Sequence, residues 1–160
     1  MKTPPFRADH IGSFLRPDNL MNAVRARRAD MIDDLELERA QNAAIKEIVA
    51  MQESMGLGSV TDGEFRRRGW SAGFIDAVSG FGLREGAIGF KKDGKEQKAE
   101  LSPFASGRLK RNKPIVANDL AFVKSIAKSA MPKATIASPS VMHYFLGPLA
   151  VDKEIYPDIE

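Results

Sequence analysis

Cysteine is missing from this sequence, and its absence restricts the sites that the chain can form. Without thiols there is no disulfide framework, and no thiolate metal site can be built from this chain alone. Histidine is scarce as well, since only His10 and His143 are present. Two histidines make a poor zinc site unless further ligands come from elsewhere, so we expect no metal ligands among the residues of this chain.

Long apolar runs are also missing. No segment approaches the ~18 apolar residues of a membrane span, and the first ten residues lack the apolar core of a signal peptide. We therefore expect a cytoplasmic protein without a membrane partner. The excess of one charge sign is small, with 24 basic residues against 21 acidic ones. A basic stretch at 107–113 has no aromatic residue for base stacking, so we expect no nucleic-acid partner.

The apolar periodicity predicts alternating strands and helices. The clearest helix spans 33–55, where Asp33 and Glu36 have the spacing of a capping box. Its predicted buried stripe consists of Ala40, Ala44, Ile48, Met51 and Met55. Further helices are predicted at 18–28 and 117–130, one or two helical turns at 70–77, and the start of a last helix at Asp152. The predicted core strands are 6–11, 59–61 and 133–137.

The order strand, helix, strand, then helix and strand again predicts an α/β fold with parallel strands. A β-rich insert at 80–116 interrupts it, and Asp93-Gly94 within the insert is a hairpin signal. Open doubly wound sheets and (β/α)8 barrels both begin in this way, and a barrel usually needs ~250 residues. A single domain over 1–160 is thus either a small open sheet or an incomplete barrel, with about three of the eight strands.

Polar residues follow each of the three predicted core strands. Ile11, Gly12 and Ser13 come after the first, with His10 just before them. In parallel α/β folds such positions meet on one face, so we expect a shared binding site there. The backbone N–H groups at Gly12-Ser13 suit a small carboxylate, and the bend at Asp62-Gly63-Glu64 suits an ammonium group. Ser138-Pro139-Ser140 follows the third strand.

Each of these segments also has a plain structural interpretation. Gly-Ser and Asp-Gly pairs are common in ordinary turns, and a histidine near a strand end is often only a hydrogen-bonding group. The run Arg66-Arg67-Arg68 suits phosphates or carboxylates, but charge runs usually face solvent. Local patterns therefore predict a small-molecule site with acidic and basic corners, without identifying a reaction.

Three stretches taken together resemble one enzyme family. RADHIGSFLRP at 7–17, GLGSVTDGEFRR at 56–67 and IASPSVMHYF at 136–145 are similar to the cobalamin-independent methionine synthases, in their C-terminal-type catalytic barrel and its stand-alone relatives. Their order and spacing match the front of that barrel. The resemblance implies the N-terminal portion of a (β/α)8 barrel and a methyltransferase that moves a methyl group from 5-methyltetrahydrofolate to the thiol of homocysteine.

The resemblance also implies roles for particular residues. Ile11, Gly12 and Ser13 would bind the amino-acid end of homocysteine and Glu64 its ammonium group, with Asp62 and His10 beside them. Asp62 stands where the methionine synthases tend to carry another residue. The segment GRLKRNKPIV at 107–116 loosely resembles a folate-binding stretch, which implies a folate contact for Arg108. Ser138 and His143 would contribute to the same cleft.

Zinc is implied as well, because the family binds the homocysteine thiol to zinc. Its His-x-Cys pair and its further Glu and Cys lie in later strands, so the ligands are expected outside this chain. We accordingly expect an inactive part of a barrel, either a truncation or one half of a split protein, that associates with the remaining part or with itself. The alternatives are a related alkyltransferase with another thiol acceptor and a non-catalytic binding or assembly module.

Overall fold

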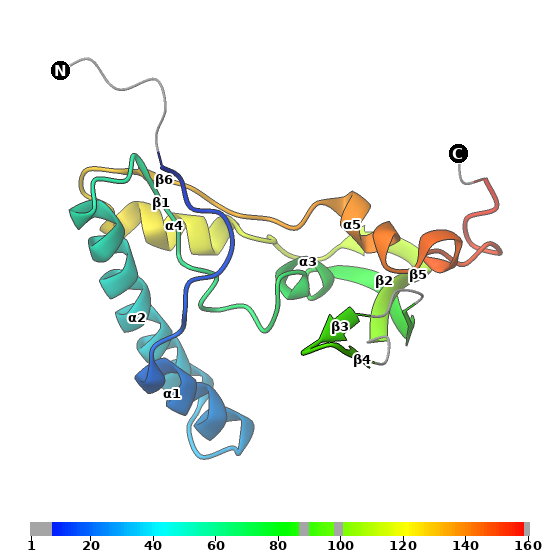
Figure 1. Ribbon diagram of the computed structural model, residues 1–160, viewed down its shortest axis with the longest axis horizontal. Coiled ribbons are helices and arrows are strands. Elements are labelled where there is room, and N and C mark those ends of the chain that lie inside the picture. The colour runs from blue at the N-terminus through cyan, green and yellow to red at the C-terminus, as the bar shows by residue number, and fades with distance from the viewer. Residues whose placement is uncertain (1–7, 87–89, 98–100, 159–160) are drawn as a thin grey trace. The chain divides into compact units, whose positions relative to one another are not determined.

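The computed structural model describes residues 8–86, 90–97 and 101–158, and these form two compact units (Figure 1). Unit 1 consists of the described residues up to Trp70 together with Val116–Thr135. Unit 2 consists of those in 71–115 and from Ile136 onward. The mixture of helices and strands agrees with the predicted α/β class, whereas a single barrel domain over 1–160 stays a prediction.

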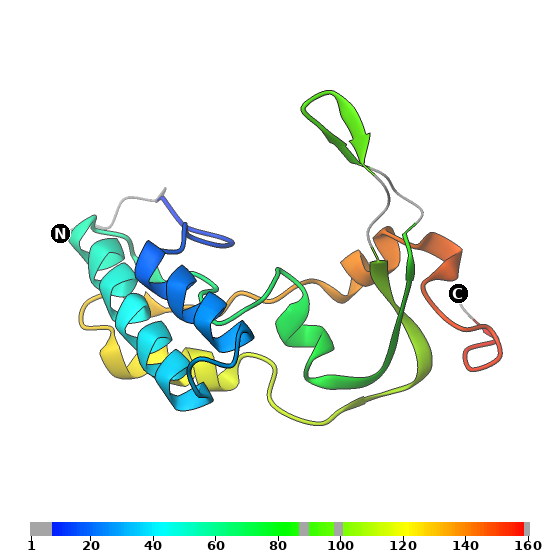
Figure 2. The same cartoon turned by 90° about the horizontal axis from the view of Figure 1, so that it is seen from below.

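Unit 1 is built from three helices and a pair of short parallel strands. The helices are α1 (Asp18–Arg28), α2 (Asp34–Ser54) and α4 (Ala117–Ile126). The strands β1 (Ser59–Val60) and β6 (Met131–Pro132) lie side by side in Figure 1, with Ser59 opposite Met131 and Val60 opposite Pro132. Figure 2 shows α1 packed along α2, which also contacts α4. The pairing is parallel, as expected for core strands of an α/β fold, but it joins β1 to β6, whereas residues 8–11 of the first predicted strand form no strand.

Helix α2 begins and ends where its sequence predicts. The Asp33 side chain accepts the N–H of Glu36, and the Glu36 carboxylate accepts the N–H of Asp33, so the capping box is confirmed. Gly56, just past the end, has φ +77°, the left-handed conformation typical of a helix stop.

The buried face of α2 differs from the predicted stripe. Its buried residues are Ala44, Ile45, Val49 and Gln52. Met55 is 71% exposed, so that part of the prediction is wrong. The buried face is rotated because α1, β1 and α4 all pack against it, forming one core of Leu20, Ala44, Ile45, Val49, Val60, Phe65 and Val123.

Two of the predicted core strands are misplaced. Residues 8–11 form no strand: the backbone N–H of His10 donates to Asp9 Oδ1 and its carbonyl accepts from Lys133 Nζ, so its backbone pairs with no strand. Residues 6–7 lie outside the described part. The last strand is β6 rather than 133–137, although the N–H of Lys133 still donates to the carbonyl of Val60. Correspondingly α4 ends at Ile126 instead of Ala130.

The Glu53 carboxylate explains why α4 ends early. Its Oε1 accepts the backbone N–H groups of Lys128, Ser129 and Ala130 at 2.7, 2.7 and 3.1 Å. These residues consequently form a bend that leads into β6. The same three bonds lower the pKa of Glu53 to about 2.

This lowered pKa makes stability depend on acidity. A carboxyl group with a lowered pKa in the folded state stabilises the fold above its unfolded pKa, and the contribution is lost as the pH falls toward 2. We expect Glu53→Gln to flatten the stability curve between pH 4.5 and 2, measured by urea denaturation. The exposed Glu38→Gln on the same helix is the control, and an equal change in both variants would contradict the assignment.

Unit 2 is mostly β structure. An antiparallel pair joins β2 (Val78–Glu85) to β5 (Leu101–Arg111), and β3 (Phe90–Lys92) forms a hairpin with β4 (Lys95–Gln97). Asp93 and Gly94 connect the hairpin with φ +53° and +75°, as a type I′ turn requires, so this prediction is confirmed. Three short helical segments complete the unit: α3 (Ala72–Ile75), α5 (Pro139–Tyr144) and the 3-10 turn Gly147–Leu149.

The chain after Asp152 makes only one turn, not a helix. The Asp152 carbonyl accepts the N–H groups of Ile155 and Tyr156, and Pro157 follows. A residue before proline is disfavoured in helical conformation, so the turn stops there. No helix in the described ranges is both long and apolar enough to cross a membrane.

Candidate functional site

The bend after β1 is stabilised by its own side chains. The Thr61 hydroxyl accepts the N–H of Gly63 at 3.2 Å, and Asp62 Oδ1 accepts the N–H of Glu64 at 3.0 Å. Gly63 and Glu64 both have a left-handed backbone, with φ +64° and +58°. Such a φ is uncommon for a residue other than glycine, so Glu64 is held in an unusual conformation.

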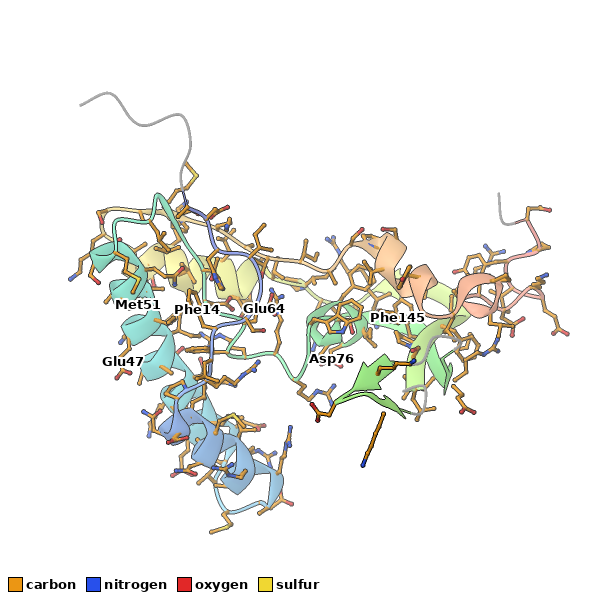
Figure 3. The ribbon with its side chains drawn as sticks, viewed as in Figure 1. Phe14, Glu47, Met51, Glu64, Asp76 and Phe145 are labelled. Carbon is orange, nitrogen blue, oxygen red and sulfur yellow. The ribbon has the colours of Figure 1, made fainter. Side chains whose placement is uncertain are left out.

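The carboxylate of Glu64 lies at the centre of a polar cluster. Its Oε2 accepts the Ser13 hydroxyl at 2.9 Å, and its Oε1 accepts the Thr135 hydroxyl at 3.0 Å. Arg67 Nη1 lies 3.1 Å from Oε1. Figure 3 shows Glu64 next to Phe14, whose backbone N–H donates to the carbonyl of Gly63. We call Ser13, Glu64, Arg67 and Thr135 the Glu64 cluster.

Two arginines tie the cluster together. Arg16 Nη2 donates to the backbone carbonyls of Glu64 and Arg67, both at 2.8 Å. Arg67 Nη2 donates to the carbonyl of Thr135. The side chains of Arg67 and Glu64 are only 7% and 8% exposed, so this ion pair is screened little by water. The cluster thus joins the segment before α1, the bend after β1 and the chain after β6.

The next arginine along the chain has a different set of partners. Arg66 Nε lies 3.0 Å from Asp119 Oδ1, and its Nη2 donates to Asn42. Burial and the nearby Asp62 charge raise the pKa of Asp119 above its ordinary value, while Arg66 and Arg67 oppose that shift. Asp62 is 5% exposed, and its Oδ2 has no hydrogen-bond partner.

The segment before α1 is hydrogen-bonded to β1 and to the residue that follows β6. Asp9 Oδ1 accepts from Lys133 Nζ at 2.5 Å and from the Ser59 hydroxyl at 2.6 Å, and these bonds lower the pKa of Asp9 to about 2. His10 stacks on Phe14 with 3.7 Å between ring centroids, and its Nε2 lies 2.9 Å from the carbonyl of Gly12. A carbonyl only accepts, so Nε2 carries the proton in this contact.

Backbone donors next to the cluster are available to a ligand. Among the described residues, the N–H groups of Ile11, Gly12 and Ser13 make no intramolecular hydrogen bond. Gly12 has φ +96° and Ile11 is 82% exposed, so this stretch faces solvent. Free N–H groups beside a buried carboxylate can bind the two charged ends of an amino acid, a carboxylate on the N–H groups and an ammonium on the carboxylate.

The structure brings together part of the predicted site. Ser13 and Glu64, 51 positions apart in the sequence, are hydrogen-bonded, whereas the binding roles expected of the predicted residues stay untested. Sequence reasoning missed Thr135 and Arg16, and it left Arg67 open between a carboxylate-binding role and a solvent-facing charge run. A signal for Arg67 was its position three residues after Glu64, while Thr135 was obscured by the misplaced last strand.

The remaining predicted site residues belong to unit 2. Arg108 lies on β5 with its guanidinium 5.4 Å from the ring centre of Tyr156. The Ser138 hydroxyl is 2.7 Å from that of Ser140 at the start of α5. His143 is in α5, and its side chain lies outside the described part. Their roles as folate contacts stay predictions.

A metal centre cannot be assigned to these residues. No group of three or more His, Cys, Asp or Glu side chains in the described ranges could hold a metal ion. The described residues therefore do not offer the ligand set for the zinc that the resemblance implies.

Comparison with known proteins gives a consistent picture, although no family model matches the chain. It is 37% identical over 156 residues to the uncharacterized protein YxjH of Bacillus subtilis, covering 98% of the chain and 40% of that protein. It is 32% identical over 129 residues to a methionine synthase of Sulfolobus acidocaldarius, covering 81% and 37%. A putative vitamin-B12 independent methionine synthase of Listeria monocytogenes superposes with a TM-score of 0.70 at 29% identity, covering 95% and 41%. The chain thus spans about two fifths of these relatives.

Proposed function

Because the chain belongs to the cobalamin-independent methionine synthase family, we propose that it forms the amino-acid corner of a methyltransferase acting on homocysteine. The methyl donor in this proposal is 5-methyltetrahydrofolate, and the whole protein is cytoplasmic. The observation that carries the proposal is the contact between Ser13 and the buried Glu64 carboxylate, next to three backbone N–H groups that have no partner within the described ranges.

The ammonium group of the substrate would bind at Glu64. A carboxylate has about four acceptor positions, two on each oxygen. Thr135 and Arg67 contact Oε1, while Ser13 is the one partner of Oε2 among the described residues. An ammonium group can therefore take the second position on Oε2 while keeping the existing bonds. The carboxylate of the substrate would then bind the N–H groups of Ile11, Gly12 and Ser13.

The role of these residues is to orient the substrate. A methyl group on the N5 nitrogen of a folate is attached to a poor leaving group, so its transfer needs a strong nucleophile and protonation of that nitrogen. Holding both ends of the amino acid would fix the direction of its thiol. The sulfur would then already be oriented toward the methyl group, and such alignment lowers the barrier to transfer. In this proposal Arg108, Ser138 and His143 contribute to folate binding.

Replacing Glu64 by glutamine tests the assignment. Glutamine has nearly the same shape but carries no charge, so the ammonium group loses its ionic partner. We expect homocysteine to bind about 10- to 150-fold more weakly, which corresponds to ~1.5–3 kcal/mol for a hydrogen bond to a charged group. The measurement is isothermal titration calorimetry on the intact protein.

The matched control is the same substitution at Glu47, Glu47→Gln. Glu47 is exposed on α2 and is labelled in Figure 3. It should bind homocysteine as the parent protein does. Equal affinity of the Glu64→Gln and parent proteins would overturn the ammonium assignment. Tight binding of a different thiol amino acid with the same Glu64 dependence would point to the alternative acceptor, and no amino-acid binding at all would favour an assembly module.

A further inference from the structure

We propose that Asp62 is a positioning residue, which holds Glu64 in its left-handed conformation and so directs the Glu64 carboxylate toward Ser13 and Thr135. The identity of the ligand in its test rests on the proposed function. The sequence suggested instead that Asp62 binds the substrate itself. Asp62 and Glu64 are about equally buried, at 5% and 6% exposed, but Asp62 Oδ1 is already occupied by the backbone N–H of Glu64.

The hydrogen bond from the Glu64 N–H to Asp62 Oδ1 is the first part of the argument. At 3.0 Å and two residues apart it is an Asx-turn contact, which bends the backbone locally. A non-glycine residue at φ +58° persists only where its surroundings enforce that conformation. The neighbouring Thr61 hydroxyl makes the equivalent bond to Gly63, so two successive side chains enforce two successive left-handed residues.

The unused oxygen of Asp62 is the second part. Oδ2 is buried without a partner, so the carboxylate is held by one oxygen only. Asparagine has the same acceptor in the same place, and asparagine side chains form the same turn. If Asp62 acts through Oδ1 alone, Asp62→Asn therefore keeps the bend, whereas Asp62→Ala removes it.

The direction of the Glu64 carboxylate depends on this bend. Ser13 and Thr135 reach Oε2 and Oε1 from chain segments on either side of the bend, and Arg16 fixes the carbonyl of Glu64. A change of the Glu64 backbone out of the left-handed region would turn the side chain away from both hydroxyls. The predicted loss is consequently specific for ligands that use the Glu64 carboxylate.

The experiment compares the parent protein with Asp62→Asn and Asp62→Ala. Two ligands are titrated by calorimetry: homocysteine and 4-mercaptobutyrate, which lacks only the ammonium group. We expect Asp62→Ala to bind homocysteine about tenfold more weakly, with 4-mercaptobutyrate unchanged, and Asp62→Asn to bind both as the parent does. Hydrogen exchange of the Glu64 amide, followed by NMR, should be at least tenfold faster in Asp62→Ala only.

The outcomes separate this inference from the proposed function. If the parent does not bind homocysteine but the Glu64 amide loses protection only in Asp62→Ala, the proposed function fails and the positioning role stands. If homocysteine binds and Asp62→Ala changes neither its affinity nor the amide exchange, the positioning role is wrong. Equal losses in Asp62→Asn and Asp62→Ala, or an equal loss for both ligands, would also overturn it.

Discussion

Replacing Arg67 by alanine should lower the free energy of unfolding by about 3–5 kcal/mol, the cost of breaking a buried ion pair by removing one partner. The reason is that both side chains of the Arg67–Glu64 pair are at least nine-tenths buried. Alanine would leave the Glu64 carboxylate without its cation and would also free the carbonyl of Thr135. Urea denaturation of the parent and variant proteins measures the difference.

A second variant distinguishes the ion pair from simple loss of packing. Adding Glu64→Gln to Arg67→Ala removes the uncompensated charge, so the double variant should be more stable than Arg67→Ala alone. The exposed Arg39→Ala on α2 serves as the matched control and should change stability little. A double variant that is no more stable than Arg67→Ala would show that the charge of Glu64 is not what makes the loss costly.

Replacing Gln52 by methionine should have an effect of similar size, about 2–6 kcal/mol. Gln52 is fully buried, and its amide bonds both backbone groups of Thr61: Nε2 donates to the carbonyl at 2.9 Å and Oε1 accepts the N–H at 3.0 Å. Methionine fills the space but leaves two buried backbone groups without partners, each costing about 1–3 kcal/mol. Thermal or urea unfolding gives the measurement.

The control for this variant is Gln41→Met, a half-buried position on the same helix. It changes the same side chain without involving Thr61, and we expect less than 1 kcal/mol. Similar losses in the two variants would mean that the backbone groups of Thr61 find other partners, contrary to the role assigned to Gln52.

Local signals predicted the elements whose boundaries are set by neighbouring residues. The capping box of α2, the hairpin turn at Asp93-Gly94 and the bounds of α1 all depend on residues a few positions apart, and all were found in the sequence. The contact between Ser13 and Glu64 was expected because both follow predicted strands, although the segment around Ser13 is not a strand.

Long-range contacts account for what the sequence did not predict. Gln52 is polar and was not expected in the core, yet Thr61 gives it buried partners nine residues away. Thr135 was missed because Glu53 ends α4 early, so that the last strand lies at Met131–Pro132 instead of the predicted 133–137. Thr135 then follows the strand instead of lying within it. Neither effect has a local pattern, since each depends on which helix packs against which loop.

The three hydrogen bonds to Glu53 also affect which side chain reaches the Glu64 carboxylate. A pair of two-residue strands specifies its register weakly, and a slip of one residue turns every following side chain to the opposite face. By fixing the residues directly before Met131, Glu53 sets the register of β6 against β1. A helix on the outside of the pair thereby determines that the hydroxyl of Thr135, rather than the side chain of Ala134 or Ile136, reaches Glu64.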